Sequence, residues 1–408
     1  MTFRIALSGL NAASTDLEVT GNNIANSATN GFKESRTEFA DVFANAIQDT
    51  SSNAAGQGSR VSRVAQQFGQ GTIDFTSNNL DLAISGQGFF VLESPDGTQA
   101  YTRSGAYSVD RNGFVINHAS DRLQIYEAST GVGGTTSFNT GVLSDLQLPT
   151  APSSPQATSM MQTALNLSSS AAAPVAPFDP TVTNSYNYST STTAYDSLGN
   201  SHTVKLYYVK TAANTWDQHM YVGNDATADV QTLTFNSSGD ITSPSGTVTT
   251  RAFNPPGSGA LPITIDIDFS EMTQFGSASS VNNLNQNGFT SGRLAGVDID
   301  TEGVVFARYT NGQSSALGKV ALAKFNNQQG LRQIGDTNWA ESFASGSPQF
   351  GEAGTSSFGQ IQSGALEASN VDIAAQLVNL ITAQRNFQAN AEVISTADAV
   401  TQTIINIR

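Results

Sequence analysis

The stretch at residues 22–39, NNIANSATNGFKESRTEF, marks a change of structure along the chain. Upstream of it, apolar residues recur at the spacing of an amphipathic helix. Within it, a polar run leads into Asn30-Gly31, a pair that allows a left-handed turn because glycine tolerates positive φ. The sequence therefore predicts an N-terminal helix that ends near this stretch, then a turn and a connecting segment.

The two ends of the chain share one apolar rhythm. Near the N-terminus, intervals of 4, 3, 7 and 7 residues separate Phe3, Leu7, Leu10, Leu17 and Ile24. The same intervals separate Ile373, Leu377, Leu380, Phe387 and Ile394, and the stripe then shifts to Ala397, Val400, Ile404 and Ile407. This spacing predicts two long helices with coiled-coil character. Asn370 is the expected N-cap of the second helix, with Asp372 in its first turn.

Composition limits the possible partners. The chain has 408 residues, enough for two or three domains, with 33 acidic against 18 basic residues and a net charge of -15. That balance argues against nucleic acid and anionic membranes, which attract basic surfaces. Cysteine is absent, so no disulfide or thiol site forms. We expect no membrane insertion and no cleavable signal peptide, because no apolar run has the required length.

Between the helical ends, the pattern predicts antiparallel strands. Pro95-Asp96-Gly97 and Asn112-Gly113 are strong hairpin turns, and Pro-, Ala- and Ser-rich runs follow Pro149. The expected fold class is α+β multidomain, with terminal coiled-coil-like helices paired in an α domain, followed by nested mainly antiparallel β domains. The expected divisions are a terminal helical domain (1–30 plus 366–408), a connecting segment (31–70), a split β domain (71–146 plus 285–365) and an inserted outer β domain (147–284).

The helical ends carry few charges: residues 1–31 contain only Arg4, Asp16 and Glu18. A solvated coiled-coil surface usually carries Glu and Lys at its flanking positions. One interpretation is a two-helix hairpin within a soluble monomer. We favour the other, in which the ends are poorly ordered alone and fold together when subunits associate, because two helices by themselves leave much of each exposed.

Sites of chemistry are not indicated. The only histidines are scattered, at His118, His202 and His219. The run from Asp298 through Asp300 and Glu302 begins like a calcium loop, but Tyr309 stands where a bidentate acid is required. We therefore expect no catalytic residue, no cofactor and no metal.

Four long motifs carry a family resemblance. ALSGLNAASTDLEVTGNNIANSATNGFKESRTEF (6–39), NLDLAISGQGFFVL (79–92), YTRSGAYSVDRNGFVIN (101–117) and SGALEASNVDIAAQLVNLITAQRNFQANAEVISTADAVTQTIINI (363–407) resemble the rod and hook family of flagellar axial proteins. The motifs lie toward both ends of the chain and occur in the family's order. The insertion at 147–284 resembles the hook members of the family more than its rod members.

The resemblance implies a non-enzymatic subunit of a helical homopolymer, which forms a curved, flexible tube that transmits torque as a universal joint. The terminal helices would line the tube, and the chain would leave them between Asn26 and Phe32, with Phe32 and Phe39 as anchors. Implied partners are further copies of the chain, the distal rod protein, the hook cap protein, the hook–filament junction proteins and the flagellar export apparatus. The implied location is extracellular, in the flagellum.

The resemblance also defines an expected assembly interface, which comprises Phe3, Leu7, Leu10, Leu17, Ile24, Asn26, Asn30, Gly31, Phe32, Ile373, Leu377, Leu380, Phe387, Ile394, Val400 and Ile404. Two alternatives remain open. One is a distal rod protein of the same family. The other is a secreted β-rich carbohydrate-binding protein or enzyme, in which Asp266 and Asp268 would act only if a further carboxylate converges on them.

Overall fold

Two terminal helices enclose a series of strands in the computed structural model, which describes residues 2–42, 56–130, 136–223, 227–257, 259–355 and 357–406. The expected α+β class with mainly antiparallel sheets is confirmed. The chain forms two compact units, of which the second consists of residues 151–295 with 309–313. The first unit contains the remaining described residues. The finer division into domains stays a prediction.

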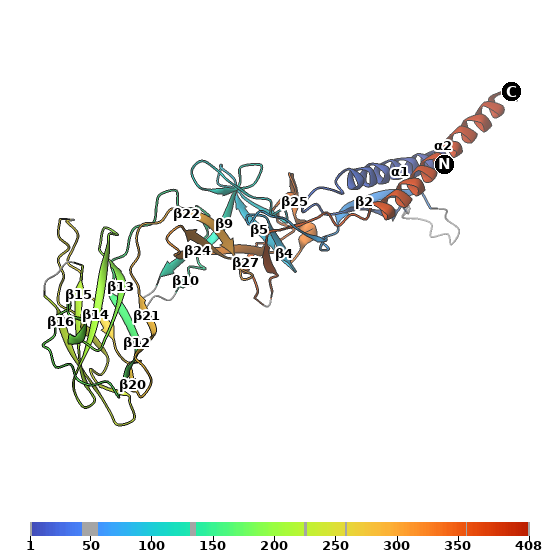
Figure 1. Cartoon of the computed structure of the whole chain (residues 1–408). Helices are drawn as coiled ribbons and strands as arrows, with labels where there is room; N and C mark the ends of the chain where they lie inside the picture. The colour runs from blue at the N-terminus through green and yellow to red at the C-terminus, as the bar shows by residue number, and fades with distance from the viewer. Residues whose placement is uncertain are drawn as a thin grey trace. The chain divides into compact units, whose positions relative to one another are not determined.

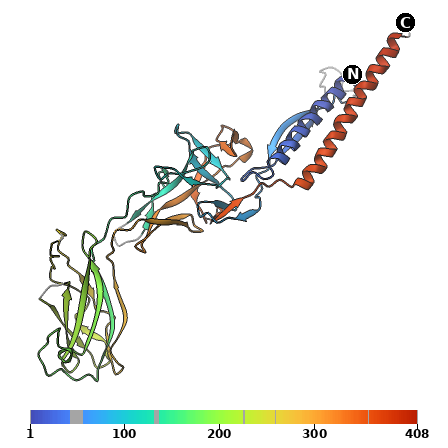
Figure 2. The same cartoon turned by 45° about the horizontal axis from the view of Figure 1, so that its top comes forward.

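The helices α1 (Thr2–Ala25) and α2 (Ile373–Asn406) lie side by side and antiparallel (Figures 1 and 2). Asn23 Nδ2 donates to Gln376 Oε1 at 3.3 Å, and Gly9 lies against the side chain of Asn390. This register places Thr2 opposite Ala397. Because α2 has 34 residues and α1 only 24, the last part of α2 runs beyond the start of α1.

The ends of the helices follow local chemistry. Asp372 Oδ1 accepts the N–H groups of Ala374 at 2.9 Å and Ala375 at 3.2 Å, so Asp372 is the N-cap of α2. The prediction of Asn370 as this cap is wrong, because tertiary contacts engage the Asn370 amide. After α1, Gly31 has φ of 70°, which confirms the expected left-handed turn.

A two-stranded hairpin lies along α1. Its strands are β1 (Ser35–Asp41) and β2 (Ser59–Gln66). Asn23 joins α1 to β1, because its Oδ1 accepts the Ser35 N–H at 2.9 Å and its Nδ2 donates to the Ser35 carbonyl at 2.7 Å. Near the other end of α1, the Ser59 N–H donates to Ser8 Oγ at 3.3 Å.

The remaining strands of the first unit build a 13-stranded sheet with the principal order β22-β23-β24-β9-β5-β6-β26-β25, and two ladders, β28-β4 and β29-β3. Their bounds are β3 (Ile73–Phe75), β4 (Leu82–Ser85), β5 (Phe89–Glu93), β6 (Gln99–Thr102), β7 (Ser108–Val109), β8 (Val115–Ile116), β9 (Arg122–Thr130), β10 (Thr136–Phe138), β11 (Ser144–Asp145), β22 (Leu294–Ile299), β23 (Val304–Tyr309), β24 (Ser314–Lys324), β25 (Arg332–Gly335), β26 (Asn338–Ala340), β27 (Gln349–Glu352), β28 (Gln360–Ser363) and β29 (Ala365–Glu367), with a short 3-10 helix at Gln328–Gly330.

An aromatic core stabilises this sheet. The rings of Phe68, Phe89 and Trp339 pack edge to face, with centroids 5.6–5.7 Å apart. Trp339 Nε1 donates to Gln66 Oε1 at 2.6 Å, which ties the end of β2 to the sheet. The ladders β28-β4 and β29-β3 return the chain to the start of α2.

The second unit contains two five-stranded sheets, ordered β13-β14-β15-β16-β17 and β18-β19-β12-β20, with β21 paired to β12. Their bounds are β12 (Met160–Ser168), β13 (Tyr188–Tyr195), β14 (Ser201–Ala212), β15 (Thr215–Val222), β16 (Asp229–Phe235), β17 (Ile241–Ser243), β18 (Thr247–Thr249), β19 (Asp266–Asp268), β20 (Thr273–Phe275) and β21 (Ser280–Gln286), with a 3-10 helix at Thr183–Ser185. Burial alternates along β15, which places Trp216 in the core, where its Nε1 donates to Gln274 Oε1 at 2.9 Å.

Candidate functional site: the helical hairpin and its junction

Small and polar side chains form the seam between α1 and α2. Ala6, Ala13 and Thr20 recur every seven residues on α1 and are buried. On α2, Gln376 and Ala383 are buried at the same interval. A Cβ built on Gly9 would lie 2.5 Å from Asn390 Oδ1, which shows how closely the helices approach. The seam therefore leaves many of the larger apolar side chains outside it.

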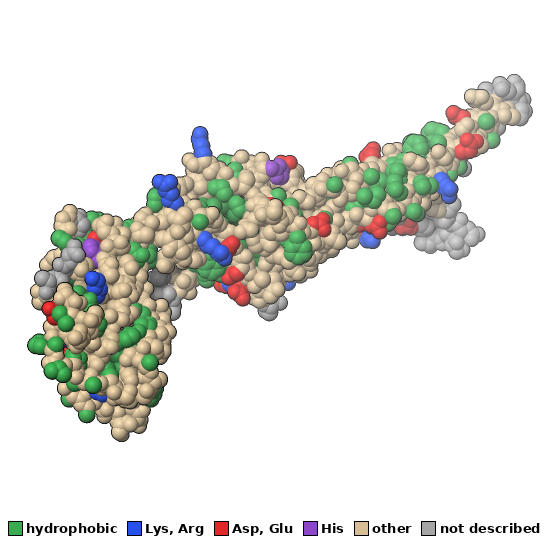
Figure 3. All heavy atoms as spheres, viewed as in Figure 1, with side chains coloured by type: hydrophobic (Ala, Val, Ile, Leu, Met, Phe, Trp, Pro, Cys, Tyr) green, Lys and Arg blue, Asp and Glu red, His purple; other side chains and the backbone are tan. Residues whose placement is uncertain are grey.

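Those larger side chains remain exposed in the single chain. Leu377 is 47% exposed and Ile381, one turn further along α2, is 50% exposed. The other large apolar residues that are exposed in the described part of the two helices are Phe3, Ile5, Leu7, Ile373, Val378, Val393 and Val400. Apolar side chains gather along the helical hairpin in Figure 3. Contiguous exposed apolar surface is typical of an interaction site.

The structure distributes the residues of the expected interface over three environments. Phe3, Leu7, Ile373, Leu377 and Val400 are exposed. The partly buried set comprises Leu10, Leu17, Ile24, Asn26, Asn30, Leu380, Phe387 and Ile394. Gly31 and Phe32 are buried within their own chain. Ile404 lies in α2, but its side chain is outside the described residues.

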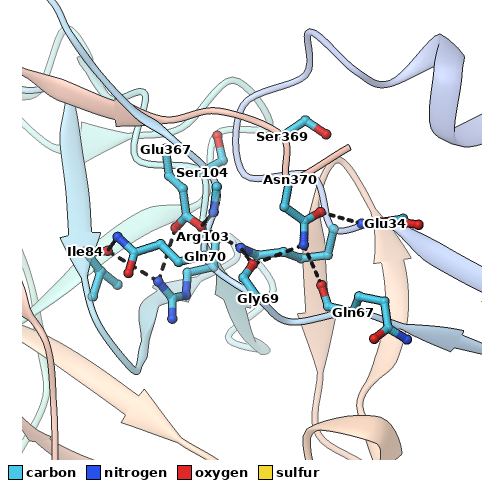
Figure 4. A network of polar contacts seen from close by, with 12 residues as sticks. Glu34, Gln67, Gly69, Gln70, Ile84, Arg103, Ser104, Glu367, Ser369 and Asn370 are labelled. Atoms are coloured by element: carbon cyan, nitrogen blue, oxygen red, sulfur yellow. Dashed lines mark hydrogen bonds and ion pairs between the residues drawn. The ribbon is translucent and has the colours of Figure 1, made fainter. Parts of the chain in front are cut away.

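A buried charged cluster lies where the helical hairpin meets the sheet (Figure 4). Glu367 Oε1 accepts from Lys33 Nζ at 2.5 Å and from the Gly71 N–H at 3.0 Å. Glu367 Oε2 accepts from Arg103 Nη1 at 3.1 Å. The Glu367 carbonyl accepts the Gly31 N–H at 2.8 Å, so this residue also fixes the turn after α1.

Two cations share one carboxylate in this cluster, and all three side chains are almost fully buried. Burial lowers the pKa of Lys33, and the adjacent Glu367 carboxylate opposes that shift. Burial lowers the pKa of Arg103 for the same reason. Lys33 Nζ also donates to the Gly69 carbonyl at 2.8 Å, and Arg103 Nη2 to the Gly86 carbonyl at 2.7 Å. Hydrogen bonds within the chain occupy most of the donors and acceptors of this cluster. The cluster therefore has a structural role.

Asn370 and Gln376 extend the tie to the helices. Asn370 Oδ1 accepts the Glu34 N–H at 2.7 Å, and its Nδ2 donates to the Gln67 carbonyl at 2.8 Å. Gln376 Nε2 donates to Glu34 Oε1 at 2.8 Å. Three passes of the chain, before β1, after β2 and before α2, are thus held together at one point (Figure 4).

Sequence reasoning missed this junction. Lys33, Arg103 and Glu367 each lie within one of the family-like motifs, and charged residues are scarce in this chain. Glu367 was an available signal, because it stands between Leu366 and Ala368 and a charge between apolar neighbours is often paired. The pairing itself was not available, because Lys33 and Glu367 are 334 positions apart.

No group of three or more His, Asp or Glu side chains that could hold a metal occurs within the described residues. Asp298 contacts Arg308, and Asp266 accepts a hydrogen bond from Thr249 at 2.5 Å. His202 and Asp196 are 3.2 Å apart, and the His219 ring stacks on Phe178. None of the helices in the described ranges combines the length and hydropathy that crossing a bilayer requires.

A terminal helical hairpin with exposed apolar residues, joined by buried contacts to the β-sheet of its own unit, defines a structural subunit of a larger assembly. Family models agree with this class. They match residues 3–33 (flagella basal body rod protein), 83–161 (flagellar hook protein FlgE/F/G D1 domain), 166–289 (flagellar basal body protein FlaE D2 domain) and 362–407 (flagellar basal body rod FlgEFG protein C-terminal).

Full-length relatives define the family more narrowly. The chain is 38% identical to the flagellar hook protein FlgE of Escherichia coli and 39% identical to that of Salmonella typhimurium, in both cases over 100% of both chains. The chain belongs to the flagellar hook protein family. A crystal structure of Helicobacter pylori flagellar hook protein FlgE2 shares the fold, with a TM-score of 0.54 and 14% identity over 72% of this chain and 100% of that one.

Proposed function

We propose that the chain is a structural subunit of the bacterial flagellar hook and that its copies polymerise into a tube through their terminal helices. The exposed face of α2 carries this proposal. Ile373, Leu377 and Ile381 are spaced by four residues, so they lie on one face, and all three are exposed in the single chain. Fully burying such a side chain contributes about 1.5–3 kcal/mol, so covering the remaining half of each favours association.

The unequal helix lengths support the same proposal. Beyond Ala397, α2 continues past the start of α1, and Val400 is exposed there. A neighbouring copy would complete the packing of this segment. Such a contact joins different surfaces of two copies, so it is a head-to-tail contact. When it repeats without closing into a ring, it generates a helical tube.

The second unit suits a joint that bends while it turns. Its outer positions are mostly Ser, Thr, Asn and Gly, and only 12% of the whole chain is charged. Contacts between such surfaces are small and hydrated, so they break and re-form at little cost. Copies would then shift against one another in each rotation while the helices keep the tube intact.

The proposed partners are other copies of this chain, the distal rod protein, the hook cap protein and the hook–filament junction proteins. The flagellar export apparatus would deliver the chain, and the hook would lie outside the cell. The proposed role is non-enzymatic.

Electron microscopy of the purified chain at increasing concentration tests the proposal. We expect tubes or short curved filaments. Monodisperse particles at every concentration, with ends that resist proteolysis, would favour the secreted β-rich alternative. Deletion of residues 147–284 separates the hook from the rod alternative, because loss of a hook insertion should leave tubes that differ in curvature.

A further inference from the structure

A cavity of about 540 Å³ opens at the C-terminal end of α1, wholly within the first unit. Its walls come from the last turn of α1, the turn that follows, and the β25–β26 hairpin. The residues that line the cavity include Asn22, Asn26, Asn30, Ala106, Asn338 and Trp339. A volume of this size is ample for several side chains of a bound segment.

Amide side chains form part of the cavity wall, beside apolar residues such as Phe32 and Trp339. Asn22 lies in the last turn of α1, Asn26 directly follows the end of the helix, and Asn30 lies in the turn beyond it. Asn26 Nδ2 donates to the Asn22 carbonyl at 3.0 Å. On the rim, His118 and Asp336 lie 3.5 Å apart and are exposed. Because amides both donate and accept, these walls fit a polar protein surface.

The wall opposite α1 has an unsatisfied acceptor. Asn338 is 4% exposed, and its Nδ2 donates to Asp121 Oδ2 at 3.1 Å. Its Oδ1 is buried and has no hydrogen-bond partner in the described part of the chain. Leaving such an atom unpaired costs about 1–3 kcal/mol. A donor from outside, reached by a small shift of the wall, would relieve that cost.

The residues just before Asn338 are conformationally strained. Asp336 and Thr337 have φ of 53° and 56°, a left-handed conformation that non-glycine residues rarely adopt. Strain of this kind typically costs about 1–3 kcal/mol per residue and gathers at binding sites. The two-residue loop of the β25–β26 hairpin itself favours positive φ, so the observation that points to an incomplete site is the unpaired Asn338 Oδ1 beside it.

The cavity continues the exposed face of α1. Phe3, Leu7, Glu18 and Asn22 fall on one side of the helix, and all are exposed. The path from Leu7 to Asn22 spans about 22 Å at 1.5 Å per residue. A partner helix that covers the apolar start of this face therefore reaches the cavity at its end. The exposed surface of α2 carries suitable amide donors, at Asn379, Gln384, Asn386 and Gln388.

We propose that this cavity is a docking site for a second copy of the chain, which inserts an amide or hydroxyl donor against the β25–β26 hairpin. The inference rests on the proposed function, since it assigns part of the contact between subunits. It also gives the Asn-rich end of α1 a role in recognition between copies.

The absence of cysteine allows a direct test, because one introduced thiol is the only one present. In the variant Asn22→Cys, maleimide labelling of dispersed subunits is compared with labelling of sedimented polymer. We expect polymerisation to slow labelling at least tenfold. The variant Ser237→Cys, at an exposed turn of the second unit, shows that the reagent reaches assembled subunits. A change of less than twofold at position 22 in polymer would overturn the proposal.

Two further measurements decide the occupant and the energetic role. With a benzophenone maleimide on Asn22→Cys, polymer should give cross-linked dimers, and a product cross-linked only within one chain would contradict the proposal. The variant Ala106→Phe should fill the cavity and raise the critical concentration at least tenfold. Ala344→Phe, at an exposed alanine outside the cavity, is its control. If circular dichroism shows that Ala106→Phe does not fold, the labelling of Asn22→Cys decides whether the proposal holds.

The outcomes separate this inference from the function beneath it. If the unaltered chain forms no polymer, the proposed function fails and this docking site fails with it. If polymer forms while position 22 stays freely accessible, only the docking site fails.

Discussion

Lys33 and Glu367 lie 334 positions apart in the sequence, yet Lys33 Nζ is 2.5 Å from Glu367 Oε1 and both side chains are fully buried. This ion pair joins the turn after α1 to the segment that leads into α2. Because Arg103 binds the second oxygen of the same carboxylate, the pair also ties both segments to the sheet. One carboxylate therefore joins three segments of the first unit, beside the amide contacts of Asn370 and Gln376.

Glu367→Gln should destabilise the first unit strongly. The substitution leaves two buried cations without a counter-charge, and breaking a buried pair in this way costs about 3–5 kcal/mol. Differential scanning calorimetry should show a lower unfolding temperature for the first unit and no change for the second. Glu352→Gln is a matched control, because Glu352 pairs with Lys319 at 2.5 Å but is 30% exposed. If Glu367→Gln and Glu352→Gln lowered the unfolding temperature of the first unit equally, the buried pair would not stabilise the unit more than the exposed one.

Gly31→Ala tests the turn after α1. A Cβ at this position would lie 2.4 Å from the Ser104 backbone nitrogen, and the residue has φ of 70°. Gly97→Ala carries a similar left-handed φ of 83° with no atom within 4 Å of the added Cβ. The left-handed conformation alone costs about 1–2 kcal/mol, so Gly97→Ala should lose that much and Gly31→Ala clearly more. Urea unfolding followed by circular dichroism measures the stability of both variants. Equal unfolding midpoints would contradict the close approach of Gly31 to the Ser104 backbone.

Leu377→Asp should block polymerisation without unfolding the subunit. Leu377 is already 47% exposed in the single chain, so the hairpin tolerates the charge, whereas a neighbouring copy that covers it does not. Ser395→Asp adds the same charge at an exposed polar position of α2 and should polymerise more readily than Leu377→Asp. Sedimentation of polymer, with circular dichroism of the subunit, gives the comparison. If Leu377→Asp formed polymer normally, the face of α2 that carries Leu377 would not be part of the interface between copies.

Leu380→Asp should behave differently, although Leu380 is only three residues further along α2. Leu380 is partly buried beside the seam, so a carboxylate there should disturb the pairing of α2 with α1 as well as polymerisation. We expect a loss of helical signal at 222 nm that Leu377→Asp does not show. The same helical signal in both variants would contradict the assigned register.

The stability of the second unit should fall in acid. Burial opposes ionisation of Asp196, but hydrogen bonds from Asn200, His202 and the Leu198 N–H outweigh it and lower the pKa of Asp196 to about 2, from an ordinary 3.8. A depressed carboxyl pKa contributes stability above the unfolded value and loses it as pH falls through the folded one. Between pH 3.8 and 2 we expect a loss on the order of 1–2 kcal/mol after allowance for solvent screening. Asp196→Asn should remove that part of the pH dependence, and an unchanged profile would contradict the assignment.

Local features of the structure could be predicted from the sequence because they depend on neighbours along the chain. The heptad rhythm gave both helices, and the expected hairpin turns appear at Gly97 and Gly113, with φ of 83° and 88°. Each of these follows from spacing or from the conformational freedom of glycine.

Features that depend on distant segments could not be predicted. Asn370 precedes α2 and resembles an N-cap, but its amide bonds to Glu34 and Gln67, and Asp372 caps the helix instead. Periodicity likewise identifies an apolar face without saying what covers it. Leu377 and Leu380 belong to one sequence stripe, yet the first is exposed and the second turns toward the seam.

A helical reconstruction of the assembled tube by electron cryomicroscopy would show whether the terminal helices hold neighbouring copies together. We expect side chains of other copies to cover Ile373, Leu377 and Ile381, which the single chain leaves about half exposed. A tube held together only by its β units, with these three residues facing solvent, would contradict this expectation.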